Sequence, residues 1–465
     1  MSIYSITLTP CIVKKRSYFS YTTNTKILHL YIHIYFDIIS LTKKKEDDFM
    51  KKQYIIVLLL FLYTFITNLY QPVMPYFVES RQLSGSMYGF FIAAVSFGSM
   101  LGAPFWGNLF DKDKKKFALI SGVILYAIFQ VIFAISTNSF IMLITRFISG
   151  FGIITINTVL YSEINYITTK KDRGKFITLS SVASTLGISL GYFLGGSMTQ
   201  WKFLVAKFGD NIFQVIIIIQ ALLTLFLAII YFIFFNPEES EEKNIINKRS
   251  LKDRINSLKA YSIEFILFLI AFTLITAATM STTKYIDVYF KDLGYGANIL
   301  GRYHMIIGIV SLVSGLLFIP IIKNIQNKTM FIVLLQFLNI IVIFISFRSS
   351  NFLLMAYTFL ILFAISKVFF TPVELQHISS YANNNNYGEI IGIRSSFLSL
   401  GNILGPLLGA IFYSKSSTTL FDINIVIFSI SIVLLILGYY IIYIKQKIMK
   451  RGKKNELGKI NCEGI

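Results

Sequence analysis

The amino-acid sequence predicts an all-α integral membrane protein whose twelve transmembrane helices form two repeated six-helix bundles. Its composition, the spacing of its apolar segments and an internal repeat support this prediction. Of the 465 residues, 55% are hydrophobic and only 14% are charged, whereas about a quarter of the residues in a soluble protein are charged. A chain of this composition cannot cover a water-facing surface, which excludes a soluble enzyme, a secreted disulfide scaffold and a disordered protein.

Twelve segments of the chain are long and apolar enough to cross a bilayer, which takes about 20 mostly apolar residues in a helix. Short polar or charged loops join most of them, and the longest break, residues 236–260, divides the spans into six and six. The predicted spans are 54–76, 87–110, 117–136, 139–162, 175–198, 211–235, 261–284, 298–320, 329–347, 351–374, 388–413 and 420–444.

Lysine and arginine are divided unequally between the two sides that these spans define. The loops on one side, together with the C-terminal tail, hold 23 of these residues, whereas the loops on the other side hold 6. Because basic loops stay in the cytoplasm, we expect both termini to be cytoplasmic. This distribution also accounts for much of the net charge of +20, so the charge requires no nucleic-acid partner.

The spans and loops predict five regions of the chain. These are an N-terminal extension at 1–49, a six-helix bundle at 50–235, a central cytoplasmic loop at 236–260, a second six-helix bundle at 261–445 and a basic cytoplasmic tail at 446–465. In the central loop, Leu251, Ile255 and Leu258 follow helical spacing, which favours a short helix on the membrane surface over a flexible linker. The extension is expected to be either a leader preceding a natural start at Met50 or an amphipathic segment.

The two halves of the chain contain matching segments in their fifth and eleventh spans. Gly174–Gly196 and Gly388–Ala410 align without a gap, which predicts a parallel repeat about an axis along the membrane normal. Both segments contain glycines spaced four residues apart, on one helix face, where a neighbouring helix can approach closely. We expect either ordinary helix packing or matched sliding contacts of the kind that alternating access needs. These glycines are Gly187, Gly191 and Gly195 in the first half and Gly401, Gly405 and Gly409 in the second.

Three further short motifs accompany the repeat. Residues 72–75 read PVMP and close the first span, where proline frees backbone carbonyls and bends a helix end. Residues 107–116 read GNLFDKDKKK and follow the second span. Residues 146–152 read RFISGFG within the fourth span, and an arginine there either faces a polar cavity or a partner, or extends to the membrane interface.

Together with residues 187–196, these motifs resemble those of the major facilitator superfamily, and within it the twelve-helix drug:proton antiporters, over Lys51 to about Lys447. The segment at 107–116 is similar to G-x-L-x-D-[RK]-x-G-[RK]-[RK], with Lys114 in place of glycine. The segment at 187–196 is similar to G-x-x-x-G-P-x-x-G-G, with Tyr192 in place of proline. The resemblance implies the major facilitator fold, transport by alternating access, and export rather than import.

The resemblance also implies roles for individual residues. It assigns Arg146 to proton coupling and Gly196 to the helix-packing glycines. It further implies a conformational latch in the second loop, in which the aspartate at the end of one helix pairs with basic groups in the loop or on a neighbouring helix. The predicted latch residues are Gly107, Asp111, Lys112, Lys115 and Lys116.

Several polar residues lie within the spans, where charges are rare and usually functional. Lys367 and Glu374 share one face of the tenth span at about 10 Å along the axis, too far apart for a direct pair. Lys367 is expected to bind a polar or anionic substrate or to pair with an acid on another helix. Lys367 and Glu374, together with Arg146 and Glu163, are candidates for proton coupling or cavity charge. Lys367, Asn68, Gln71 and Asn157, the last on the same face as Arg146, are candidate substrate-cavity residues.

The sequence therefore predicts a monomeric secondary transporter in the lipid bilayer of a bacterial inner (plasma) membrane, which uses protons to export small amphipathic compounds. The alternative is a facilitator or proton symporter for a sugar, an organic anion or another metabolite. It is favoured by Lys367 and by the absence of the first-span acid that many drug:proton antiporters carry.

An enzyme is not expected, because the chain has no phosphate-binding loop, HExxH or GxSxG motif and its four histidines are scattered. Cys11 and Cys462, one in each tail, form neither a metal site nor a disulfide framework. No catalytic residue, metal or cofactor is predicted.

Overall fold

The computed structural model describes residues 48–169, 172–237, 261–322, 324–382 and 387–460. The chain divides into two compact units, Met1–Tyr54 and Ile55–Ile465, and all contacts below belong to the second. The predicted surface helix of the central loop and the first 47 residues lie outside the described residues. Within the described part, every predicted span coincides with one of twelve helical segments long and apolar enough to cross a membrane.

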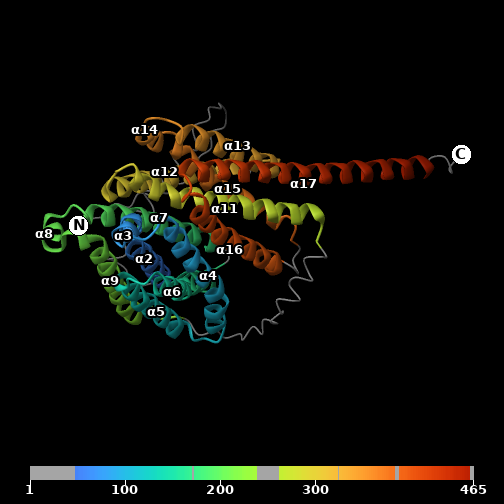
Figure 1. Ribbon diagram of the computed structural model, residues 1–465. Coiled ribbons are helices and arrows are strands. Elements are labelled where there is room, and N and C mark those ends of the chain that lie inside the picture. The colour runs from blue at the N-terminus through green and yellow to red at the C-terminus, as the bar shows by residue number, and fades with distance from the viewer. Residues whose placement is uncertain (1–47, 170–171, 238–260, 323, 383–386, 461–465) are drawn as a thin grey trace, which may run out of the picture. The chain divides into compact units, whose positions relative to one another are not determined.

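The first half of the chain contributes six spans, some of them broken into shorter helices (Figure 1). Its elements are α2 (Asp48–Asn68), η1 (Gln71–Val73), α3 (Met74–Ser80), α4 (Gly85–Asp111), α5 (Lys115–Ile135), α6 (Ser139–Ile167), α7 (Arg173–Met198), α8 (Lys202–Phe208), η2 (Gly209–Asn211) and α9 (Ile212–Phe234). Pro72 and Pro75 lie in the first turns of η1 and α3. The PVMP motif was predicted to close the first span, but the span continues through α3 to Ser80 and the motif interrupts it.

The second half contributes the other six spans. Its elements are α11 (Ile263–Asp292), α12 (Ala297–Ile322), α13 (Lys328–Ser346), α14 (Phe352–Tyr357), α15 (Phe359–Ser379), α16 (Tyr387–Phe412) and α17 (Ser417–Ile460). The seventh span was predicted to end at residue 284, but α11 continues to Asp292. The polar residues beyond 284 belong to the helix because side chains such as Asp287 are fully buried against other helices.

The glycine repeat packs helices together within each half. A Cβ added at Gly191 would lie 2.5 Å from the carbonyl oxygen of Phe65 on α2, and one at Gly405 would lie 2.5 Å from that of Ala277 on α11. Gly187 and Gly195 also face α2, and Gly401 and Gly409 also face α11. In this conformation these glycines pack helices inside one half, α7 against α2 and α16 against α11; whether the contacts also slide stays a prediction.

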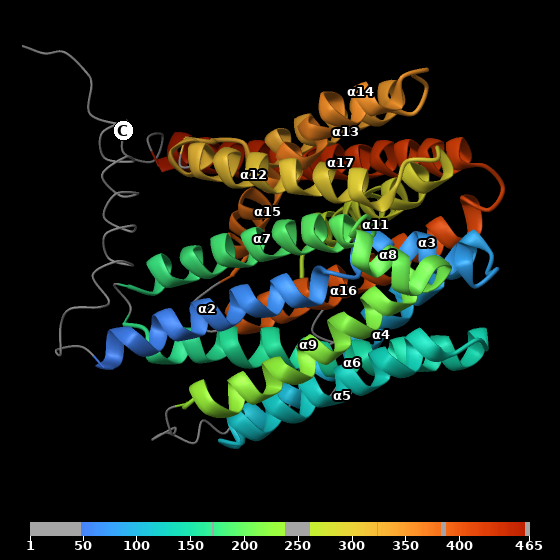
Figure 2. The same ribbon diagram turned by 90° about the vertical axis from the view of Figure 1, so that its left-hand side faces the viewer.

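Among the described residues, two long helix pairs make the most extensive contacts between the halves, and both meet toward one end. α7 contacts α12 where Gly196 lies against Ala297 and Gly301, and α4 contacts α16 where Gly89 lies against Pro406 and Ala410. Figure 2 shows α7 and α12 converging toward this end and separating toward the other. We call it the closed end. It carries the loops poor in lysine and arginine.

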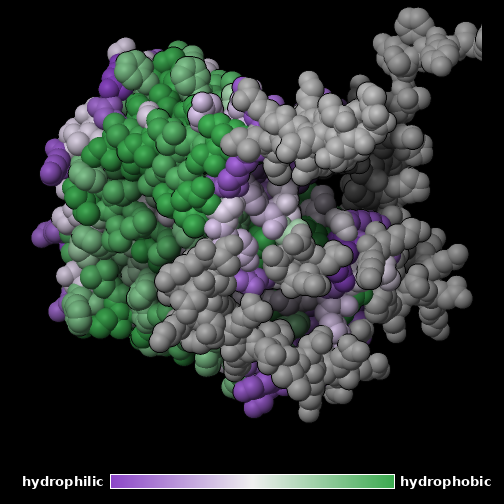
Figure 3. Space-filling view, turned by 90° about the vertical axis from the view of Figure 1, so that its right-hand side faces the viewer, coloured by the Kyte–Doolittle hydropathy of each residue, from purple (hydrophilic) through white to green (hydrophobic). Residues whose placement is uncertain are grey.

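The opposite end, which carries the basic loops, is open between the halves. A Cβ added at Gly174 near the start of α7, or at Gly388 or Gly392 near the start of α16, would meet no described atom within 4 Å. Figure 3 shows a broad apolar outer surface, with hydrophilic residues at its edges and around an indentation. Apolar side chains such as Phe232 of α9 and Phe337 of α13 are exposed, as expected of helices that face lipid.

Candidate functional site

A buried acid–imidazole pair lies where the halves meet. Asp287 of α11 is fully buried, and its Oδ1 lies 2.7 Å from Nε2 of His304 on α12. The hydroxyl of Tyr88 on α4 donates to Oδ2 of Asp287 at 3.3 Å, and the ring of Tyr192 on α7 stacks on His304 with centroids 4.0 Å apart. Asp287 therefore binds groups from both halves, and its pairing with His304 was not predicted.

Lys284 of α11 adds a cation to this polar region. Its Nζ lies 3.3 Å from Oε1 of Gln71 and 3.4 Å from the hydroxyl of Tyr192, so this α11 side chain reaches both the first span and α7. Gln71 was predicted as a cavity residue and does contact the second half. Asn68, predicted for the same role, is half-buried and donates to the carbonyl of Thr64 in its own helix at 2.7 Å.

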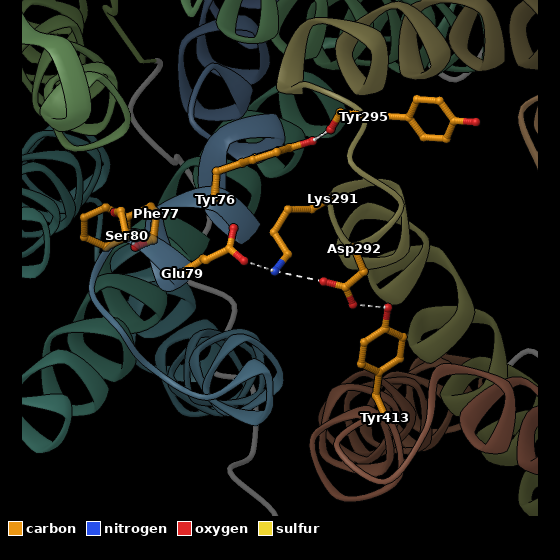
Figure 4. Close-up of polar contacts among 8 residues, drawn as sticks. All are labelled: Tyr76, Phe77, Glu79, Ser80, Lys291, Asp292, Tyr295 and Tyr413. Carbon is orange, nitrogen blue, oxygen red and sulfur yellow. Dashed lines mark hydrogen bonds and ion pairs between the residues drawn. The ribbon is translucent and has the colours of Figure 1, made fainter.

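The closed end has a second set of contacts nearer its surface (Figure 4). Lys291 of α11 lies 3.0 Å from a carboxylate oxygen of Glu79 on α3 and 2.8 Å from one of Asp292. The hydroxyl of Tyr413 donates to Asp292 at 2.7 Å. Burial and this bond hold the pKa of Tyr413 well above its usual range, so the hydroxyl remains a donor. The hydroxyl of Tyr76 also donates to the backbone carbonyl of Tyr295.

The second half encloses a cavity of about 270 Å³, lined by α11, α13, α15 and α16. Lys367 of α15 is exposed to it and forms no ion pair with another described residue. Glu374, one to two turns further along, is fully buried and accepts two bonds from the guanidinium of Arg394 on α16, at 2.8 and 2.7 Å. The expectation of an acid partner for Lys367 is therefore wrong: the cavity's carboxylate binds Arg394.

Arg146 lies in the interior of the first half, away from that cavity. It is only 2% exposed, donates to Oε1 of Gln130 at 2.9 Å and to the hydroxyl of Tyr70 at 3.4 Å, and lies 3.8 Å over the ring of Phe133. It therefore does not extend to the interface. Asn157 was predicted on the same face, but it is exposed while Arg146 is buried.

The predicted latch is only partly assembled. Lys115 and Glu163 are both buried and lie 3.1 Å apart, which ties α5 to α6 inside the first half. Asp111 and Lys112 are exposed, and Asp111 forms no ion pair with another described residue. The expectation that Asp111 makes the latch pair is thus wrong for this conformation, since the buried cation of this loop, Lys115, pairs with Glu163 of α6 instead.

The remaining latch residues lie around the same turn. Lys116 donates to Oδ1 of Asn236 at 3.2 Å, and Gly107 faces Thr158 of α6. The turn also explains why Lys114 can replace the glycine of the motif. The left-handed backbone falls on Asp113, with φ of 62°, whereas Lys114 has φ of −90°, and aspartate tolerates the left-handed region better than most residues.

Among the described residues, no cluster of three or more His, Cys, Asp or Glu side chains could hold a metal ion. The geometry consists instead of twelve spanning helices, halves that touch at one end, and an internal pocket with buried charges. These features define a solute transporter of the membrane rather than an enzyme.

Comparison with known proteins agrees with this class. Residues 56–363 and 320–460 match the Major Facilitator Superfamily, and the chain belongs to this family of transporters. It is 28% identical over 359 residues to multidrug resistance protein 2 of Bacillus subtilis (strain 168), covering 76% of this chain and 84% of that protein. It is 23% identical over 364 residues to quinolone resistance protein NorA of Staphylococcus aureus (strain MSSA476), covering 76% and 88%.

Solved structures show the same fold. A bacterial homologue of the human lysosomal transporter Spinster, in an inward-facing and occupied conformation, has a TM-score of 0.66 at 12% identity and covers 83% of this chain and 96% of that one. The nucleoside transporter NupG has a TM-score of 0.64 at 16% identity, covering 84% and 98%. The protein therefore has the major facilitator fold, and its described residues form twelve helices long and apolar enough to span a membrane.

Proposed function

We propose that this transporter exports small amphipathic compounds in exchange for protons, by alternating access. The observation that carries the proposal is that, among the described residues, the halves pack together toward one end, while the pocket lies on the other side of those contacts. A rocking motion of the halves would open one end as it closes the other. The names of the multidrug and quinolone resistance relatives support compounds of this kind as substrates.

The orientation follows from the basic loops. With both termini in the cytoplasm of a bacterial cell, the closed end faces outward and the pocket is reached from the cytoplasm in this conformation. A substrate would enter from the cytoplasm, and the contacts of Glu79, Lys291, Asp287 and Tyr88 would have to break before it could leave. A monomer in the inner membrane is sufficient for this cycle.

Asp287 is the carboxylate we assign to proton coupling. It is bonded to Tyr88 of the first half and to His304 of the second, so proton exchange at the pair would change bonds that join the halves. Asp287 was one of three candidate carboxylates in the sequence, and the other charged candidates have different partners: Glu374 binds Arg394, Glu163 binds Lys115, and Arg146 lies among neutral groups. For these other charged candidates and for Lys367, we propose support of the helices and the pocket rather than proton transfer between the halves.

Export can be tested in a bacterial host without its own efflux pumps. Cells with the transporter should accumulate less of at least one amphipathic fluorescent compound from a panel of cations and anions, and a protonophore should abolish the difference. Asp287→Asn should remove it, whereas Asp422→Asn, which changes an exposed carboxylate paired with Arg348, should not. Equal accumulation with and without the transporter for every compound would contradict export.

The second candidate is a facilitator or proton symporter for a polar metabolite or organic anion. The observation that favours it is Lys367, a cation in the pocket without a carboxylate partner among the described residues. Proteoliposomes separate the two functions. A facilitator would bring a labelled metabolite to equal concentrations on both sides without a proton gradient, whereas an exporter would need the proton gradient to accumulate its substrate against the substrate's own concentration gradient.

A further inference from the structure

We propose that the substrates of this transporter are small aromatic anions, bound by Lys367 in the pocket of the second half. We call this cavity the Lys367 pocket and define it by Lys367, Phe272, Phe363, Phe370, Gln336 and Asn339. The proposal rests on the proposed export function, and it names the charge of the compounds that the pocket accepts.

The charges around the pocket leave an excess of positive charge. Glu374 receives both of its bonds from Arg394, so this pair is neutral within itself. Lys367 has no ion-pair partner among the described residues. Lys284 lies on α11 one turn beyond the lining residue Met280, and its hydrogen-bond partners, Gln71 and Tyr192, are neutral. Asp287 is already bonded to His304 and Tyr88.

An unpaired ammonium group inside a membrane protein is unfavourable unless an anion compensates it. A substrate with a carboxylate would supply that compensation through a charge-assisted hydrogen bond, which is stronger than a bond between neutral groups. A cationic substrate would instead meet Lys367 and Lys284 without a free carboxylate in the pocket wall. The electrostatics of the pocket therefore select anions.

The other walls suit a flat ring next to that negative group. Phe272, Phe363 and Phe370 line the pocket from α11 and α15. Gln336 and Asn339 of α13 also line it; both are at most 4% exposed, and the Asn339 amide donates to Oε1 of Gln336 at 3.1 Å. Nε2 of Gln336 is left buried without a partner and is a donor for a substrate oxygen. The volume of about 270 Å³ fits a compound of one or two rings.

Two probes with the same ring system and opposite charge test the selection directly. These are 1-naphthylacetate, an anion, and 1-naphthylmethylammonium, a cation. The purified full-length protein in detergent should bind 1-naphthylacetate at least about tenfold more tightly than 1-naphthylmethylammonium, since a bond to a charged group contributes about 1.5–3 kcal/mol. Everted vesicles that contain the protein should take up the anion when a proton gradient is applied.

Variants at Lys367 distinguish the charge from the shape of the side chain. Lys367→Met should weaken binding of 1-naphthylacetate by about tenfold or more, whereas Lys367→Arg should retain it. Lys367→Glu should lose the anion and gain the cation. Lys415→Met, at an exposed lysine outside the pocket, is the matched control and should bind both probes as the wild type does.

The outcomes separate this proposal from the export function. If the wild type binds or exports the cation but not the anion, or if Lys367→Met and Lys367→Glu both bind the anion normally, the anionic substrate class is overturned while export stands. If anion binding depends on Lys367 but no probe or panel compound is driven by the proton gradient, export is overturned while the pocket assignment stands.

Discussion

The two halves of the molecule share a helix order and a glycine stripe, but they treat their interior cations differently. Arg146 in the first half is closed in by Gln130, Tyr70 and Phe133, whereas Lys367 in the second half faces an open pocket without an acid partner among the described residues. An interior cation surrounded by neutral donors, acceptors and rings stabilises a scaffold. A cation left exposed in a pocket is available to a substrate. This difference supports the proposal that substrate is bound mainly by the second half.

The largest expected effect tests what the halves have in common. Gly191→Leu and Gly405→Leu should each prevent folding, because even a Cβ at either position would lie 2.5 Å from a backbone oxygen. Gly174→Leu and Gly388→Leu, in open space, are the matched controls and should fold. Size-exclusion profiles of fluorescent fusions would measure this, and tolerance of leucine at position 191 or 405 would contradict the shared packing.

The next prediction tests what distinguishes the halves. Arg146→Met should lower the thermal unfolding temperature, because it leaves the buried Oε1 of Gln130 without its donor, at about 1–3 kcal/mol for an unpaired group. Lys367→Met should leave that temperature unchanged or raise it, because it removes an unpaired charge. Thermal unfolding of the two purified variants measures both. If Lys367→Met destabilises the protein as much as Arg146→Met does, the two cations do not differ as described.

A smaller effect is expected at the contact between the halves. Glu79→Gln removes one of the two carboxylates of Lys291, which should change stability by less than about 1 kcal/mol because Glu79 is exposed. It should still favour opening of the closed end. Labelling of Ala297→Cys, buried against Gly196, by an impermeant maleimide in whole cells should then rise severalfold. Unchanged labelling would show that the Glu79–Lys291 pair does not help to keep the closed end shut.

The smallest effect is expected for an ion pair inside one half. Arg348 and Asp422 lie 2.6 Å apart, but both are roughly half exposed, and exposed pairs contribute about 0–1 kcal/mol. Asp422→Asn should therefore alter neither the labelling of Ala297→Cys nor, beyond about 0.5 kcal/mol, the stability. An effect as large as that of Glu79→Gln would show that opening of the closed end also depends on contacts inside one half.

The twelve spans could be predicted from the sequence because lipid requires long apolar segments whatever the neighbouring helices are. The interruption at Pro72 and Pro75 could be predicted for a local reason, since proline lacks a backbone donor. The end of α11 could not. Its last turns are polar, and only their burial against other helices keeps them within the span.

The candidate site was less predictable, because its pairs join different helices. Asp287 meets His304, and Glu374 meets Arg394, and no short motif contains either pair. The residues that the sequence identified one by one, such as Lys367, lie in helices long and apolar enough to span a membrane, but their partners depend on how α11, α12, α15 and α16 pack. The sequence did contain a signal for His304. This histidine lies inside the predicted eighth span, and Asp287 lies just after the end of the predicted seventh span.

Distances between spin labels at the two ends would test alternating access most directly. One pair is Gly174→Cys with Gly388→Cys at the open end, and the other is Gly85→Cys with Ser414→Cys at the closed end, each after Cys11→Ser and Cys462→Ser. In membranes with and without a proton gradient and 1-naphthylacetate, we predict that the first distance shortens as the second lengthens. Distances that change in the same direction, or that do not change at all, would contradict the account.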